Sequence, residues 1–203
     1  MGQPYVIMPA QGSDQADEWV RLGVDAQVGN RLPEAQNKYQ QALRLDPRHA
    51  IALQNLAIVF AQSNLLNEAL LTIERAAMCD GVHAAIQMNW ALMSLESERI
   101  DDALVSARKA VDMAPKDVNA IMSLAMALTT SGHAGEAIPL YNRILEEVPN
   151  HPAAGPNSCF IQTLADITPK DLLEQRTKWH KANKQAGLGM HHNDKNPNRP
   201  VRI

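Results

Sequence analysis

Few residues in this sequence have the types and the spacing that metal binding requires. His180, His191 and His192 form the densest group of imidazoles in the chain. A metal site on a helix needs ligands three or four positions apart, with further ligands nearby. His191 and His192 are instead adjacent and precede a proline-rich stretch. We interpret them as solvated linker residues and expect no metal and no other cofactor.

Paired carboxylates and cysteines offer no better candidate for chemistry. The acidic pairs at 101–102 and 146–147 fit solvated helix faces. Cys79 and Cys159 match neither a disulfide framework nor a zinc site, and they fit a reducing compartment. No glycine-rich phosphate loop and no nucleophile motif is found. The sequence therefore predicts no catalytic residue, and we do not expect these 203 residues to act as an enzyme.

Charge and hydropathy exclude further classes of function. The formal net charge is -3, so no overall positive field favours nucleic acid. Residues 168–203 carry eight Lys or Arg against three Asp or Glu, which fits a solvated helix face and a linker better than a nucleic-acid arm. The first fifteen residues lack the pattern of a signal peptide, and no apolar run is long enough to span a membrane. We expect a cytoplasmic protein that binds neither membranes nor nucleic acid.

A period of 34 residues organises most of the chain. From Ala16 onward, four blocks follow without insertion, namely 16–49, 50–83, 84–117 and 118–151. Small residues recur at block positions 8 and 20, where the residues are Gly23, Ala57, Ala91, Ala125, Ala35, Ala69, Ala103 and Ala137. Small residues at such positions allow two antiparallel helices to approach closely. A Pro or Gly at block position 32 ends the second helix.

This pattern resembles the tetratricopeptide repeat (TPR) family, most fully in the first block, with Trp19, Leu22, Gly23, Ala35, Tyr39, Ala42 and Pro47. The resemblance implies an all-α, right-handed superhelix of four helix-turn-helix repeats, whose first helices line a concave groove. We expect residues 1–15 to form a flexible tail before the repeats. Pro139 should delay the start of its helix or bend it.

The same resemblance indicates which residues face the groove. The candidate peptide-binding residues are Arg21, Gln54, Asn55, Ile58, Met88, Asn89, Leu92, Met122, Ser123 and Met126. Asn55 and Asn89 are one repeat apart, and an asparagine amide can both donate to and accept from the main chain of an extended peptide. The methionines would form an adaptable apolar floor. Alternatively, the asparagines bond neighbouring helices and the methionines only pack.

The C-terminal part follows a different pattern. We expect capping and junction helices over 152–186 and a linker over 187–203. The segment resembles the junction between repeats and catalytic domain in SPINDLY-like and O-GlcNAc-transferase-like glycosyltransferases, at Thr168, Pro169, Asp171, Leu172, Leu173, Arg176, Trp179, His191, Asn193, Pro197, Arg199, Pro200, Arg202 and Ile203. That resemblance implies that the chain ends where a catalytic domain would begin.

These observations predict a protein-interaction module. Its groove would recruit a protein partner or substrate, for a glycosyltransferase that transfers GlcNAc or fucose and whose catalytic domain is absent. One alternative is a stand-alone scaffold that forms homo-oligomers or bridges partners. Another is a chain that retains transferase activity, for which no residues can be named.

Overall fold

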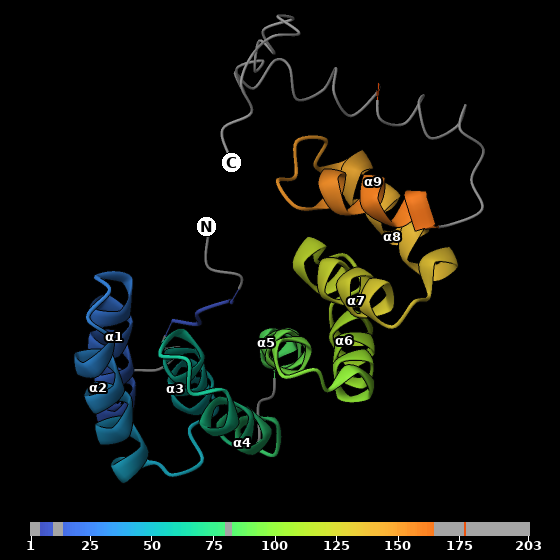
Figure 1. Ribbon diagram of the computed structural model, residues 1–203. Coiled ribbons are helices and arrows are strands. Elements are labelled where there is room, and N and C mark those ends of the chain that lie inside the picture. The colour runs from blue at the N-terminus through green and yellow to red at the C-terminus, as the bar shows by residue number, and fades with distance from the viewer. Residues whose placement is uncertain (1–4, 10–13, 80–82, 165–176, 178–203) are drawn as a thin grey trace, which may run out of the picture.

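The computed structural model describes residues 5–9, 14–79, 83–164 and 177. Within these residues the secondary structure is entirely helical, and successive helices form an arc of antiparallel pairs (Figure 1). The helices are α1 (Gln15–Val28), α2 (Leu32–Leu45), α3 (Ala50–Gln62), α4 (Leu66–Ala77), α5 (Ala84–Glu96), α6 (Ile100–Met113), α7 (Val118–Thr130), α8 (Ala134–Glu147) and α9 (Ala154–Leu164).

The first eight helices form four repeats of two helices, as the 34-residue period predicts. Each odd-numbered helix packs against the even-numbered helix that follows it. The odd-numbered helices also contact one another, since α3 contacts α1 and α5, and α5 contacts α7. They therefore form a continuous inner layer. The second helices begin at equivalent positions, and α8 runs from Ala134 through Pro139 without the delayed start that this proline was predicted to cause.

Small residues allow the two helices of each repeat to pack closely. Every alanine at block positions 8 and 20 is fully buried, and Tyr39 and Tyr141 fill equivalent sites in repeats one and four. At Gly23 the approach is so close that a Cβ atom would lie 2.4 Å from the Tyr39 ring. Burial of these apolar residues is the main source of stability for the array.

The turn inside each repeat has one recurring geometry. Asn30, Asn64, Glu98 and Gly132 occupy equivalent positions, and all four have positive φ. The next residue donates its N–H to a carbonyl five positions earlier, at 2.8 Å in every repeat, as from Arg31 to Ala26. This is a helix end closed by a left-handed residue, a conformation that Gly and Asn adopt at low cost.

The last described helix covers the end of the array. α9 packs against α8 and contributes Ile161 to the same apolar cluster as Tyr141 and Ile144. It therefore buries the exposed face of the fourth repeat, as a solenoid requires. The expected junction helix and the linker over 187–203 lie outside the described residues, apart from Thr177.

Candidate peptide-binding groove

The inner layer of helices is occupied by the chain's own N-terminal segment. Residues 5–9 lie alongside α3 and α5, far from them in sequence (Figure 1). Tyr5 to Met8 are half-buried, and Pro9 is exposed. A flexible tail was expected over residues 1–15, and of these the structure places residues 5–9 against the repeats, while 1–4 and 10–13 lie outside the described residues. The physical reason is that this segment finds both hydrogen-bond partners and apolar contacts on the repeats.

Asn89 of α5 binds both polar main-chain groups of Val6. Its Oδ1 accepts a hydrogen bond from the Val6 N–H at 2.9 Å, and its Nδ2 donates to the Val6 carbonyl at 2.9 Å. Gln54 of α3 donates to the same carbonyl at 2.8 Å. All the polar main-chain atoms of Val6 are therefore bound by side chains, so its side chain identity is not read by these bonds.

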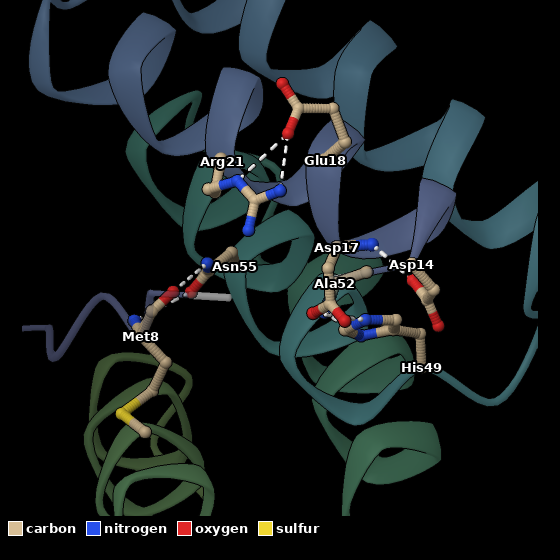
Figure 2. A network of polar contacts seen from close by, with 8 residues as sticks. All are labelled: Met8, Asp14, Asp17, Glu18, Arg21, His49, Ala52 and Asn55. Atoms are coloured by element: carbon tan, nitrogen blue, oxygen red, sulfur yellow. Dashed lines mark hydrogen bonds and ion pairs between the residues drawn. The ribbon is translucent and has the colours of Figure 1, made fainter. Parts of the chain in front are cut away.

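Asn55 of α3 repeats this arrangement one repeat earlier. Its Oδ1 accepts from the Met8 N–H at 3.1 Å, and its Nδ2 donates to the Met8 carbonyl at 2.7 Å (Figure 2). Asn55 and Asn89 are both fully buried beneath the segment. Buried amides of this kind need partners, and the segment supplies them.

The hydrogen bonds of Asn89 with Val6 and of Asn55 with Met8 define the conformation and direction of the segment. Asparagines of consecutive repeats bind residues two apart, and each binds the N–H and the carbonyl of one residue. In an extended chain these two groups point the same way, and alternate residues face the same side. The segment is therefore extended, and it runs from repeat three towards repeat two, antiparallel to the order of the repeats.

The apolar surroundings follow the same alternation. Tyr5 and Ile7 pack against the cluster that contains Ile58, Ile86 and Met93. Val6 and Met8 pack against a different cluster, which includes Ala85, Met88 and Ala120. Met8 also packs against the cluster of Val20, Ile51 and Val59. The side chains of the segment thus enter apolar clusters, while its main chain is bound by the asparagines.

One contact in the groove depends on a side-chain group of the segment. The Tyr5 hydroxyl donates a short hydrogen bond to Oε2 of Glu96, at the C-terminal end of α5. Burial raises the pKa of Tyr5 far above its ordinary value, and the hydrogen bond to Glu96 raises it further. The phenol is therefore the protonated donor at neutral pH.

Polar side chains of α1, α2 and α3 form a hydrogen-bonded chain near the groove. The Tyr39 hydroxyl donates to Oε1 of Gln27 at 2.7 Å, and the Gln27 amide donates to Gln62 at 3.1 Å. Burial raises the pKa of Tyr39, an effect that a hydrogen bond from the Asn55 side chain partly offsets. These bonds link α1, α2 and α3 through side chains.

The start of α3 is fixed by contacts shown in Figure 2. His49 caps this helix, since its Nδ1 accepts from the Ala52 N–H at 3.3 Å. Its Nε2 lies 3.4 Å from Oδ1 of Asp17, and both side chains are almost buried. Asp14 caps α1 in the same way, accepting from the Asp17 N–H at 2.8 Å. The contact between His49 and Asp17 therefore links α1 to the start of α3.

The structure brings together only part of the predicted set. Gln54, Asn55 and Asn89 bond the segment, while Ile58 and Met88 belong to the apolar clusters against which it packs. Asn55 and Asn89 therefore bond the segment, and do not bond neighbouring helices alone.

The remaining predicted residues lie away from the segment's hydrogen bonds. Met122 is buried in the cluster formed by residues of α5 to α9, and Met126 packs against that cluster. Ser123 donates to the carbonyl of Ala120 in its own helix at 2.8 Å. Leu92 is half-buried, and Arg21 is exposed and pairs with Glu18. Packing explains the positions of Met122 and Met126.

Two features of the site are absent from the set of residues predicted from the sequence. One is Glu96, whose repeat position the register predicted to face the groove, as for Gln62 and Thr130, but which was not among the candidate binding residues. The other is the occupant itself. A usable signal existed, because residues 5–8 form an apolar run between Pro4 and Pro9 in an otherwise polar N-terminus.

Comparison with known families agrees with this architecture. Two family models described as tetratricopeptide repeat match residues 20–82 and 94–155. The chain belongs to the tetratricopeptide repeat family. This TPR chain is therefore an all-α solenoid, a fold typical of protein-interaction scaffolds.

Solved structures share the fold at low sequence identity. YrrB, described as a TPR protein with an unusual peptide-binding site, is 21% identical with a TM-score of 0.71, covering 84% of this chain and 87% of its own. MamA from Desulfovibrio magneticus RS-1 is 16% identical with a TM-score of 0.76, covering 86% and 98%. PilF from Pseudomonas aeruginosa is 18% identical with a TM-score of 0.75, covering 86% and 78%. No curated protein matches the sequence significantly.

The described residues contain neither a membrane-spanning helix nor a cluster of metal ligands. None of the helices in this part of the chain is long and apolar enough to cross a membrane. Across the same residues, no group of three or more His, Cys, Asp or Glu side chains could hold a metal ion.

Proposed function

We propose that the concave groove binds an extended segment of a partner protein, chiefly through main-chain hydrogen bonds from Asn55 and Asn89. The observation that carries this proposal is the pairing of each asparagine with both main-chain groups of one residue in residues 5–8. A site that binds N–H and carbonyl groups accepts varied sequences, provided that the segment is extended.

The strength of such binding follows from the number of bonds. Each neutral hydrogen bond contributes about 0.5–1.5 kcal/mol net, and leaving a buried amide without a partner costs about 1–3 kcal/mol. Two bidentate asparagines and Gln54, together with burial of apolar side chains, suffice for a peptide affinity on the order of micromolar.

The proposal can be tested with displayed peptides. A library of random linear peptides is panned against the immobilised full chain, and enriched peptides are then measured against Asn55→Ala/Asn89→Ala. Asn37→Ala serves as the matched control, because Asn37 is an exposed asparagine of α2. We expect enriched peptides to lose at least about tenfold in affinity for the double variant only. If the peptides bound Asn55→Ala/Asn89→Ala and Asn37→Ala with equal affinity, the two asparagines would not be the binding site.

A finer proposal concerns a glycosyltransferase. We propose that the groove recruits substrates for a nucleotide-sugar transferase, on the strength of the sequence resemblance over residues 168–203 alone. The matching residues lie outside the described ones. DNA sequence downstream of codon 203 tests the proposal, since a frame continuing into a catalytic domain would support it. A frame continuing into unrelated sequence would contradict it.

A further inference from the structure

The segment in the groove also indicates which chemical features a partner needs. Asn55 and Asn89 each use their carbonyl oxygen and one amide N–H on the segment, and both are fully buried by it. A partner cannot reach these groups while residues 5–8 are in place. Any external segment that uses the two asparagines must first displace the chain's own.

From this arrangement we infer that residues 5–8 are a tethered mimic of the partner: the groove takes an extended apolar segment with a hydrogen-bond donor in the place of Tyr5, and the chain's own segment competes for it. The inference rests on the proposed function of the groove. It adds to that function the chemistry of the partner and a control on access.

Glu96 determines the donor position. Its carboxylate is on the exposed rim of the groove and accepts from the Tyr5 hydroxyl. A carboxylate accepts hydrogen bonds and cannot donate them, so a phenol suits this position and a carboxylate on the partner would be repelled.

The other positions require apolar side chains and free N–H groups. The side chains of Ile7 and Val6 enter two separate apolar clusters, where a charged group would be desolvated. The N–H groups of Val6 and Met8 are both bound, so a proline cannot occupy either position. Pro9 follows directly, after the last of these bonds.

Competition by a tethered segment has a defined effect on affinity. A segment a few residues from α1 has a high effective concentration at the groove, of order millimolar. The apparent affinity for an external peptide falls in proportion to the fraction of molecules whose groove is open. A segment that is bound nine-tenths of the time lowers that affinity about tenfold.

Proline substitution opens the groove without changing it. In the full chain, Val6→Pro/Met8→Pro removes both N–H groups that the asparagines bind, and leaves α1 to α9 unaltered in sequence. Ile7→Pro is the comparison variant, because it introduces a proline and removes one apolar side chain of the segment. It leaves the two N–H groups that the asparagines bind. Circular dichroism confirms equal helix content before binding is measured.

The probe is a fluorescein-labelled peptide, PYVIMPAQG, which copies residues 4–12. By fluorescence anisotropy, we expect the opened variant to bind it at least about tenfold more tightly than the wild type. Ile7→Pro should bind it less tightly than the opened variant, because both main-chain hydrogen bonds of the segment remain. Equal binding by wild type and opened variant would overturn the competition. Absence of binding to the opened variant would overturn the mimicry, while the displayed-peptide experiment judges the groove separately.

A double-mutant cycle tests the donor position. Replacing the tyrosine of the probe by phenylalanine should weaken binding to the opened variant severalfold, and should have no such effect when the protein also carries Glu96→Ala. An equal loss in both proteins would contradict the role of Glu96. Light scattering of the wild type completes the test, since concentration-dependent oligomers lost in the opened variant would show that the segment binds a second copy instead.

Discussion

Asn89 binds both main-chain groups of Val6, a residue 83 positions earlier in the chain, at 2.9 Å each. This contact joins the N-terminal segment to the third repeat. Because Asn55 binds Met8 in the same way, the two asparagines form a short ladder along consecutive repeats. The ladder stops where block position 6 changes to Arg21 in repeat one and Ser123 in repeat four.

The ladder predicts a pattern of amide protection along the segment. In hydrogen exchange followed by NMR, the Val6 and Met8 amides should exchange more slowly than that of Ile7. Asn89→Ala should accelerate exchange of the Val6 amide, and Asn55→Ala should accelerate exchange of the Met8 amide. Each rate should rise by roughly 5- to 150-fold, the equivalent of about 1–3 kcal/mol. Asn37→Ala should change neither rate. Uniform exchange across the three amides would show that the segment is not held by the asparagines.

The three tyrosines predict an unusual alkaline titration. The pKa values of Tyr5, Tyr39 and Tyr141 are all raised from 10.0, in each case chiefly by burial. Absorbance at 295 nm should therefore show less phenolate at pH 10 in the folded protein than in urea, where about half is expected. A folded-state titration centred on pH 10 would contradict these environments.

The same shifts determine the sign of the pH effect on stability. Each phenol has a higher pKa in the folded state than in the unfolded chain, so folding favours its neutral form. The contribution to the free energy of unfolding is complete at neutral pH. It decreases as the pH rises above about 10. Urea denaturation at pH 8, 10 and 11 should show stability falling over the upper interval.

The turn of repeat three contains a residue whose replacement should stabilise the protein. Glu98 has a φ of 58° at the position where the other repeats hold Asn30, Asn64 and Gly132. A residue other than Gly or Asn pays roughly 1–2 kcal/mol in this conformation. Glu98→Gly should therefore stabilise the protein by about 0.5–1 kcal/mol in urea denaturation.

Repeat four supplies the reciprocal control for this turn. Gly132 has a φ of 80°, and a Cβ atom there would meet nothing within 4 Å. Gly132→Ala should cost about 1 kcal/mol through backbone conformation alone. If Glu98→Gly destabilised the protein while Gly132→Ala was neutral, the left-handed turn would not be the cause.

Much of the fold could be predicted from the sequence because TPR packing is local. The spacing of alanines such as Ala35 and Ala69 fixes how each pair of helices packs, and the period fixes the order of the pairs. The orientation of Asn55 and Asn89 followed from the same register. These features depend on residues no more than one repeat, 34 positions, apart.

The occupant of the groove could not be placed in this way. Residues 5–8 contact α3 and α5 at separations of 47 to 91 positions, which no local pattern encodes. Met122 and Met126 show the opposite difficulty, since a side chain on the inner layer can be used for packing instead of binding.

Methylation of single peptide nitrogens tests the central claim most directly. The labelled peptide PYVIMPAQG is made with an N-methyl group at Val, at Ile or at Met, and each is titrated against the opened full-length variant, Val6→Pro/Met8→Pro. Main-chain binding by Asn89 and Asn55 predicts a loss of at least about tenfold for methylation at Val or Met, and little change at Ile. Equal affinities for all three peptides, or a loss confined to the Ile derivative, would contradict it.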